Sequence, residues 1–370
     1  MERLIIFGGT FDPIHNGHLR IAREASLILN ADVVFVPAKA PRWKEPNASE
    51  KDRLKMLRLA IQENGSPSFF VDECELERDG EVTYSVDTVE YFKRKYPKKE
   101  LFLLIGADEV NKFPNWHKAE ELSKMARVIF ANRPEIDIDQ SIVNDYKMVS
   151  LNFFESGEVS SSAIRTLQSI DTPTKVLNYI IENNLYFTKK LHYFLKDKRL
   201  NHSLSVAKVA YSIAKANKIE NPERAYIAGA LHDIGKELPK EDSLKIMLEF
   251  FPEYKDYPEF SFHQFTGSYL AKKEFGIEDI SILDAIKYHC TGKAHMSQLA
   301  KIIYAADKIE PTRGYDSSSL IKDCLNDYYV GFLHVIKENA KFLSAKGDST
   351  NIPLTKECFN EYLNKENKDD

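Results

Sequence analysis

Two groups of chemically reactive residues divide this chain of 370 residues. The ten histidines are unevenly placed, with three before residue 190 and seven after it. The front pair, His15 and His18, stands in the run GGTFDPIHNGHLRIA, whereas most rear histidines recur in helical patterns together with Asp233 and Asp307. This distribution predicts that the two halves carry out different chemistry.

The front run has the composition of a phosphate-binding loop. Gly8 and Gly9 allow a tight turn and a close approach of the backbone to a ligand. His15 and His18 stand at the turn and the first helical residues, where imidazoles and helix amides can meet phosphate. Such donors suit a polyphosphate whose negative charge grows during in-line displacement. Histidines near a turn are more often structural, but the complete string favours the functional interpretation.

The rear half places imidazoles and carboxylates on different predicted helices, which a bundle can bring to one interior point. The residues are His202, the adjacent pair His232 and Asp233, His263, His289 and Asp307. A single buried histidine is usually a hydrogen-bonded core residue. Four imidazoles and two carboxylates instead suit one or two borderline divalent metals, with Asp233 able to bridge. Two metals about 4 Å apart would support a phosphoryl displacement by hydroxide.

Two cations are candidates to hold phosphate beside these ligands. Lys236 lies one helical turn after His232 and can reach a phosphate oxygen, although a solvated surface lysine is the competing interpretation. Arg313 follows the predicted helix that carries Asp307. The remaining rear histidines fall outside the pattern and receive no role: His192, His295 and His334.

The elements that must position the front residues alternate between strands and helices. Apolar runs at 4–7, 33–37, 101–106 and 127–132 are bounded by Gly, Pro and Asp, as buried parallel strands are. Residues 18–30, 49–64 and 85–97 carry apolar side chains at helical spacing. The alternation predicts a doubly wound, Rossmann-like parallel sheet whose ligand lies at the carboxyl ends of the strands.

The strand pattern ends at about residue 188. Consecutive helical patterns separated by short polar breaks follow, so we expect residues 191–370 to be all-helical. We therefore predict an α/β domain at residues 1–188 and a helical domain at residues 191–370. A chain of this length accommodates two or three hydrophobic cores.

The composition excludes several classes of protein. Hydrophobic residues make up 43% and charged residues 29%, as in ordinary globular proteins. A net charge of -5 offers no basic field for nucleic acid. Four cysteines without Cys-x-x-Cys spacing predict a reducing compartment. Because the N-terminal apolar run is too short for a signal peptide or a membrane span, we expect a cytoplasmic protein without a membrane anchor. The sequence leaves the oligomeric state open.

The string GGTFDPIHNGH resembles the signature of nucleotidyltransferases with an HxGH motif. The segments PAKAPRWK, TYSVDT, GADEVNKFPNWHKAEEL, FANRP and VSSSAIR narrow the resemblance to the nicotinate mononucleotide adenylyltransferases, over residues 1 to about 188. The resemblance implies transfer of AMP from ATP to nicotinate mononucleotide in NAD biosynthesis, with Mg²⁺ on the triphosphate.

The same resemblance implies roles for individual residues. His15 and His18 would hold the phosphates and stabilise the pentacoordinate transition state, with Thr10 assisting. Triphosphate binding would fall to the residues that begin the last helix of the domain, Ser161, Ser162 and Arg165. Arginine suits this task because its planar fork binds phosphate in a bidentate manner.

Recognition of the nucleosides is also implied by the resemblance. Trp116 would stack on the pyridine ring, Thr83 would lie beside its carboxylate, and Lys44 would reach the mononucleotide phosphate. The adenosine would face Gly106, Asp108 and Arg133. A core indole is the competing interpretation of Trp116, and a solvated surface amine is that of Lys44.

The pattern H…HD…H…H…D resembles the HD-domain phosphohydrolases. HQFTGSYLAKKEFGI and AIKYHCTGKAHMSQLAKIIYAADKIEPTRGYD narrow the resemblance, over about residues 190 to 345, to a family that hydrolyses diadenosine tetraphosphate symmetrically to two ADP. It implies iron as the metal, although the ligands also suit Mn²⁺, Co²⁺ or Zn²⁺. One metal would be bound by His202, His232, Asp233 and Asp307, and a second by Asp233, His263 and His289.

Together, these features predict a bifunctional enzyme. The alternatives for the rear half are a metal-bound nucleotide sensor that regulates the transferase, and a hydrolase of another nucleotide. The alternative acceptors for the front half are the amidated mononucleotide, phosphopantetheine and a cytidylyl-transfer acceptor. Trp116 with TYSVDT favours a pyridine nucleotide. Six metal-type ligands and a complete phosphate loop argue against a purely structural protein.

Overall fold

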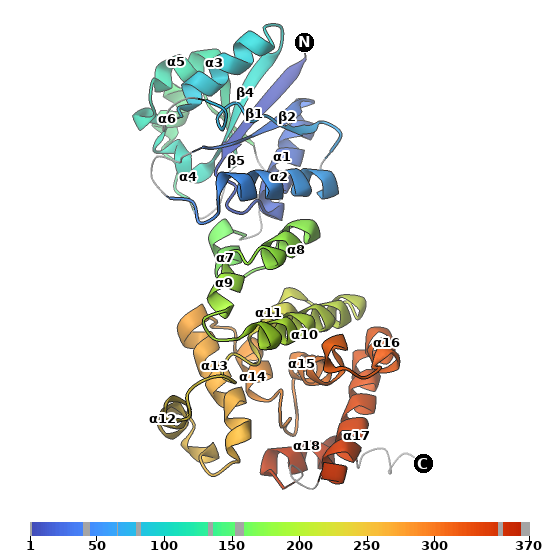
Figure 1. Ribbon diagram of the computed structural model, residues 1–370. Helices are drawn as coiled ribbons and strands as arrows, with labels where there is room; N and C mark the ends of the chain where they lie inside the picture. The colour runs from blue at the N-terminus through green and yellow to red at the C-terminus, as the bar shows by residue number, and fades with distance from the viewer. Residues whose placement is uncertain are drawn as a thin grey trace. The chain divides into compact units, whose positions relative to one another are not determined.

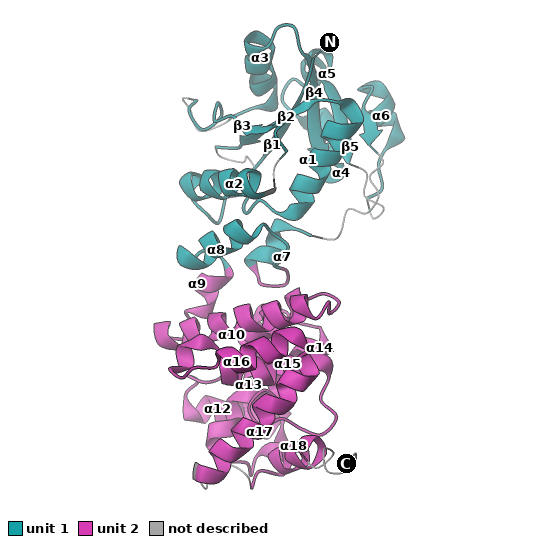
Figure 2. Cartoon of the chain, turned by 90° about the vertical axis from the view of Figure 1, so that its right-hand side faces the viewer, with its two compact units in different colours: residues 1–165, 170–186 teal, residues 166–169, 187–370 magenta. Residues whose placement is uncertain are grey.

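The computed structural model describes residues 2–39, 45–64, 66–78, 83–131, 136–151, 159–346 and 351–363. The chain divides into two compact units, residues 1–165 with 170–186 and residues 166–169 with 187–370 (Figure 2). Within the described ranges, no helix is long and apolar enough to cross a membrane.

The first unit is built on a six-stranded sheet (Figure 1). Its strands are β1 (Arg3–Gly9), β2 (Asp32–Pro37), β3 (Phe69–Val71), β4 (Glu100–Gly106), β5 (Arg127–Ala131) and β6 (Val149–Leu151). The strand order is β3-β2-β1-β4-β5-β6, and every neighbouring pair is parallel. The predicted doubly wound α/β fold is therefore confirmed. Our strand prediction missed β3 and β6, because three-residue strands show too little periodicity.

The strand order reverses beside β1, which pairs with β2 on one side and β4 on the other. Ile6 is the partner of Val34 in β2 and of Leu103 in β4, and all three side chains are buried. The carboxyl ends of β1 and β4 therefore lie next to each other. In a doubly wound sheet this switch point is where a crevice for a ligand opens.

Helices connect these strands, as the alternating pattern predicts. α1 begins at the end of the front loop and buries Gly17, Leu19, Ala22 and Ala25. The helices of this unit are α1 (Asn16–Leu29), α2 (Glu50–Asn64), α3 (Ser85–Lys95), α4 (Ala107–Val110), η1 (Phe113–Asn115), α5 (Ala119–Met125), α6 (Gln140–Asp145), α7 (Ser161–Arg165) and α8 (Thr174–Glu182).

The described part of the second unit contains helices and no strand, which confirms the helical prediction. α10 and α11 pack closely because residue 229 is glycine: a Cβ there would lie 2.6 Å from the Ala207 Cα. The helices are α9 (Phe187–Leu191), α10 (Asp197–Ala216), α11 (Glu223–Leu231), α12 (Lys240–Phe250), η2 (Pro252–Tyr254), η3 (Glu259–Ser261), α13 (Phe262–Phe275), α14 (Ile280–Lys287), α15 (Gln298–Ile309), η4 (Pro311–Arg313), α16 (Ser318–Asn326), α17 (Tyr328–Lys346) and α18 (Pro353–Leu363).

Candidate functional sites: a phosphate loop and a metal centre

The two front histidines cap α1 reciprocally. The backbone N–H of His18 donates to Nδ1 of His15 at 3.4 Å, and the N–H of His15 donates to Nδ1 of His18 at 3.3 Å. The ring centroids lie 3.7 Å apart. Because Nδ1 accepts a hydrogen bond in each ring, the neutral imidazoles carry their protons on Nε2. This tautomer is the one that donates to phosphate oxygens.

Gly17, which our sequence analysis did not single out, makes this arrangement possible. A Cβ at residue 17 would lie 2.9 Å from Nδ1 of His15, inside van der Waals contact. Any larger residue would displace the His15 ring, which is buried. The sequence alone could have pointed to Gly17, because it stands between the two capping histidines.

Asp12 fixes the loop that leads to these histidines, and our sequence analysis missed it. Its buried carboxylate accepts hydrogen bonds from the backbone N–H groups of Asn47 and Ala48, at 2.8 and 3.1 Å, and from the Tyr186 hydroxyl at 2.7 Å. Its carbonyl oxygen accepts from Arg165 Nη1 at 2.6 Å. Burial, assisted by the Asp12 charge, raises the pKa of Tyr186, so the phenol remains a donor.

Arg53 is a second buried support of the loop. Its guanidinium donates to the carbonyl oxygens of Thr10 at 2.8 Å and Lys39 at 3.1 Å. Burial lowers the pKa of Arg53, and the charge of Asp12 opposes this shift. The Ser161 hydroxyl donates to the Pro13 carbonyl at 2.9 Å. The predicted phosphate residues Thr10, Ser161 and Arg165 thus share one hydrogen-bonded network with the loop.

A cavity of about 190 Å³ opens at the switch point of the sheet. Our sequence analysis missed Glu75, whose buried carboxylate accepts hydrogen bonds from the hydroxyls of Thr83 at 2.8 Å and Thr88 at 2.7 Å. The cavity brings together five of the predicted ligand-binding residues, Gly8, Gly9, Thr83, Gly106 and Trp116.

The other predicted residues of the front site are placed differently. Trp116 is half-buried and packs against Phe113 with ring centroids 5.2 Å apart, so it is both a core indole and part of the cavity wall. Asp108 and Ser162 are exposed. Lys44 and Arg133 lie outside the described residues.

The second unit brings all six predicted metal ligands together. Asp233 stands at the middle, with its two oxygens facing different histidines. Oδ2 lies 3.9 Å from Nε2 of His202 and 3.7 Å from that of His232, whereas Oδ1 lies 3.4 Å from Nε2 of His263 and 3.6 Å from that of His289. The Nε2 atoms of His202 and His232 also lie close to Oδ1 of Asp307, at 3.3 Å and 3.7 Å respectively.

Outer contacts direct all four rings toward this centre. Nδ1 of His202 lies 2.8 Å from the Glu310 carboxylate, and the Nδ1 atoms of the other three lie 2.7–2.8 Å from backbone carbonyls, those of Gly229, Phe260 and Ile286. Such contacts place the proton on Nδ1 and leave the Nε2 lone pair for a metal. The Nε2 atoms of His202 and His232 are buried and form no hydrogen bond with any described residue. Glu310, one turn after Asp307, was not predicted.

The protonation states of His232, His263, Asp233 and Asp307 are those of metal ligands. At His202 burial lowers the pKa, but the contacts with Asp307 and Glu310 outweigh burial and raise it. Burial lowers the pKa of His232 to about 4 and that of His263 well below its ordinary value, although Asp233 opposes both shifts. Burial by itself would raise the pKa values of Asp233 and Asp307. The imidazoles around Asp233, and Lys308 and Arg313 beside Asp307, instead lower them well below the usual range. Neutral imidazoles and ionised carboxylates bind divalent cations.

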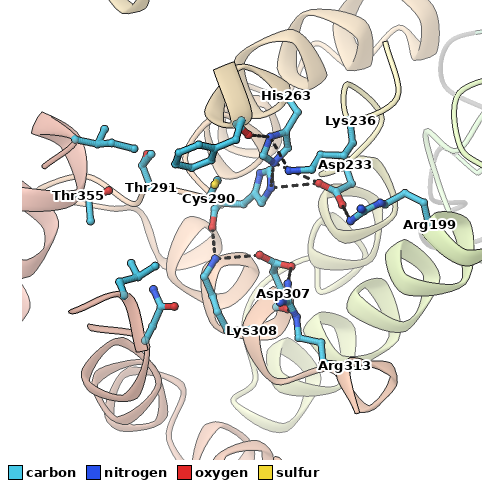
Figure 3. Close-up of a pocket in the computed structure, with 15 residues that line it drawn as sticks. Arg199, Asp233, Lys236, His263, Cys290, Thr291, Asp307, Lys308, Arg313 and Thr355 are labelled. Carbon is cyan, nitrogen blue, oxygen red and sulfur yellow. Dashed lines mark hydrogen bonds and ion pairs between the residues drawn. The ribbon is translucent and has the colours of Figure 1, made fainter. Parts of the chain in front are cut away.

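A cavity of about 210 Å³ adjoins the centre and is lined by four cations (Figure 3). Arg199 Nη1 lies 2.8 Å from Oδ2 of Asp233, and Lys308 Nζ lies 2.9 Å from Oδ2 of Asp307. The predicted phosphate residues are also here: Arg313 pairs with Asp307, and Lys236 Nζ lies 3.2 Å from Nδ1 of His263. Our sequence analysis missed Arg199 and Lys308.

Comparison with known proteins identifies relatives of both units. Residues 6–167 match the family described as cytidylyltransferase-like, and residues 199–312 match the HD domain family. The chain is 33% identical to a Mycoplasma pneumoniae protein named as a probable nicotinate-nucleotide adenylyltransferase/Ap4A hydrolase, over 90% of this chain and 98% of that one. It is 38% identical to the nicotinate-nucleotide adenylyltransferase of Bacillus subtilis, over 50% of this chain and 99% of that one.

Solved structures include a similar protein from Clostridium acetobutylicum, described as a predicted HD superfamily hydrolase involved in NAD metabolism. It is 35% identical and covers 48% of this chain and 95% of its own, with a TM-score of 0.43.

The Tyr186 hydroxyl is expected to stabilise the first unit. Tyr186→Phe leaves the buried Asp12 carboxylate one donor short, so the free energy of unfolding should fall by about 1.5–3 kcal/mol. Urea denaturation measures this change. Tyr179→Phe is the matched control, because that hydroxyl donates to Asp52 at 2.8 Å outside the loop, and it should cost less. Equal costs for both variants would contradict the role of Asp12.

Glu310→Gln should weaken metal binding. The variant keeps the shape of the side chain but removes the charge beside His202, and changes of this kind typically cost about 10- to 100-fold in metal affinity. Metal content after dialysis against a graded chelator series measures the loss. The control is Asp323→Asn, which changes a carboxylate that lies 2.8 Å from Nδ1 of the exposed His334. Equal metal retention in the two variants would refute the prediction.

Proposed function

Because the chain belongs to the family of proteins that join a nicotinate-nucleotide adenylyltransferase to an Ap4A hydrolase of the HD-domain type, we propose that it catalyses both reactions. The first unit transfers AMP from ATP to nicotinate mononucleotide, which yields deamido-NAD and pyrophosphate. The second unit hydrolyses diadenosine tetraphosphate to two ADP. One unit thus makes a phosphoanhydride bond between nucleotides, and the other breaks one.

The transferase needs no nucleophile from the protein. The phosphate of the mononucleotide attacks the α-phosphorus of ATP, and pyrophosphate leaves. His15 and His18 donate from Nε2, and the N-terminal amides of α1 add their dipole, where negative charge grows on the phosphates. Arg165 supplies a fixed positive charge that the Asp12 carbonyl orients. Mg²⁺ bound to the triphosphate neutralises part of its charge.

Trp116 and Thr83 support a pyridine nucleotide as the acceptor. Both line the cavity at the carboxyl end of β1, where Gly8 and Gly9 allow close approach. The Thr83 hydroxyl donates to Glu75, so the hydroxyl proton is already used. A carboxylate on the pyridine ring therefore requires other donors.

The hydrolase proposal rests on one observation: four Nε2 atoms and two carboxylates converge beside a cavity lined by four cations. His202, His232 and Asp307 with Asp233 would hold one metal, and His263 and His289 with Asp233 would hold the other. Metals bound there would activate a water molecule for attack and would neutralise charge on the phosphates. We propose iron for this histidine-rich ligand set, which suits borderline divalent metals.

The residues of the chain that surround the metals position the substrate. Arg199, Lys236 and Arg313 face the cavity and bind phosphate oxygens, with Lys308 beside them. Arginine binds such oxygens with two parallel N–H groups. Glu310 and the carbonyls behind the histidines keep the rings from rotating.

Separate variants should remove the two activities separately. Asp233→Ala removes the bridging ligand, so turnover of diadenosine tetraphosphate should fall at least about 1,000-fold while deamido-NAD synthesis persists. His18→Ala should do the reverse, because it removes a donor to the transition state, worth about 100-fold or more. Both assays use the full chain. Hydrolysis that survives in Asp233→Ala would contradict the proposed site, and a metal-loaded wild type without turnover would favour the nucleotide sensor.

The acid form of the mononucleotide should be the preferred acceptor. The comparison is ATP-dependent turnover of nicotinate mononucleotide and its amide by the wild-type chain under the same conditions. We expect a higher kcat/KM for the acid, because a hydrogen bond to a charged carboxylate is stronger than one to a neutral amide. Equal values for the two substrates would refute this preference.

A further inference from the structure

A second cavity adjoins the metal centre and has no role in the chemistry described above. Its volume is about 250 Å³, and it lies between α12 and the turn that precedes α13. We call it the α12 cavity. It shares three wall residues with the cavity of about 210 Å³ beside the metal centre, Lys236, Phe260 and His263. We call that neighbouring cavity the phosphate cavity. The α12 cavity therefore lies directly behind these three side chains, as seen from the metal centre.

The walls of the α12 cavity are mainly apolar. They are formed by Leu238, Leu244, Phe260 and Phe262. Leu244 is 41% exposed and Phe260 is 49% exposed. Large apolar side chains that gather around a hollow at the surface mark a binding site more often than scattered ones do. Polar groups are also present, since Lys240 and Glu259 line the cavity and form an ion pair of 2.6 Å.

Symmetrical cleavage makes a geometric demand on this unit. The scissile bond of diadenosine tetraphosphate lies at the middle of the molecule, so an ADP group must extend from the metals on each side. The two nucleosides then occupy different places. On one side, the phosphate cavity continues to Asn339, Leu343 and Thr355. The other side is bounded by Lys236, Phe260 and His263, behind which the α12 cavity lies.

We propose that the α12 cavity binds one of the two nucleosides of the dinucleotide, and this assignment rests on the hydrolase function proposed above. The ring of Phe260 stacks on the purine, an interaction that is typically worth about 1–3 kcal/mol per base. Leu244 covers the base from α12, and Leu238 covers it from the segment that leads into this helix. The Glu259 carboxylate accepts a hydrogen bond from an exocyclic amino group, which adenine provides.

Leu244→Arg tests the proposal, with Leu248→Arg as the matched control. Both leucines are exposed on α12 one turn apart, and only Leu244 lines the cavity. Arginine at residue 244 fills the cavity. The KM for diadenosine tetraphosphate should rise about tenfold, with kcat and metal content unchanged. The KM for adenosine 5′-tetraphosphate, which has one nucleoside, should stay within about twofold, because that nucleoside can use the other side.

A binding measurement separates this proposal from the hydrolase function itself. Equilibrium dialysis in the presence of Mn²⁺ measures how many ADP molecules bind to each full-length chain. We expect one fewer bound ADP per chain in Leu244→Arg than in the wild type or in Leu248→Arg. If the wild type hydrolyses no dinucleotide but this difference is found, the function fails and the nucleoside subsite stands. Equal ADP counts in all three proteins, equal effects of both variants on KM, or a change in oligomeric state confined to Leu244→Arg would overturn the subsite.

Discussion

Each unit is organised around a carboxylate that is almost inaccessible to water, and this burial constrains the groups around it. Asp12 is 4% exposed and Asp233 is 3% exposed. A buried charge is tolerated only when other groups compensate for its lost hydration. Around Asp12, backbone N–H groups and the Tyr186 hydroxyl compensate for the lost hydration. These hydrogen bonds also fix the loop that leads to His15 and His18. Around Asp233 the compensation comes from imidazoles and Arg199, and such an arrangement is suited to a cation.

Imidazoles serve opposite purposes in the two units, and the partner of Nδ1 decides which. In His15 and His18, Nδ1 accepts from a backbone N–H, so Nε2 carries the proton and donates. In His232 and His289, Nδ1 lies against a carbonyl oxygen, so Nε2 offers a lone pair. A helix N-terminus presents N–H groups, and a helix interior or C-terminus presents carbonyls. For these four histidines, a position at the start of a helix suits phosphate binding and a position at the end of a helix suits metal binding. His263 differs, because it stands at the start of α13 and its Nδ1 contacts the Phe260 carbonyl of the preceding turn.

Much of the fold could be predicted because its signals are local. Buried strands such as 4–7 and 101–106 are continuous apolar runs, and both were found within one or two residues of β1 and β4. The short β3 and β6 could not be recognised, since pairing with β2 and β5 defines them. The meeting of the six predicted metal-binding residues could also be anticipated, because they stand on five segments that a helical bundle can bring to one interior point.

The sequence by itself determined the residue types, their order and the local geometry. The two glycines that end β1, the capping histidines and the HD pair each lie within a short stretch of the chain. Tertiary structure decided which distant groups complete each site. Glu310 meets His202 from 108 residues away, and Tyr186 meets Asp12 from 174 residues away. The α12 cavity likewise exists only because α12 and the turn before α13 lie side by side with the metal centre. Such contacts depend on packing between elements, and no spacing along the chain encodes them.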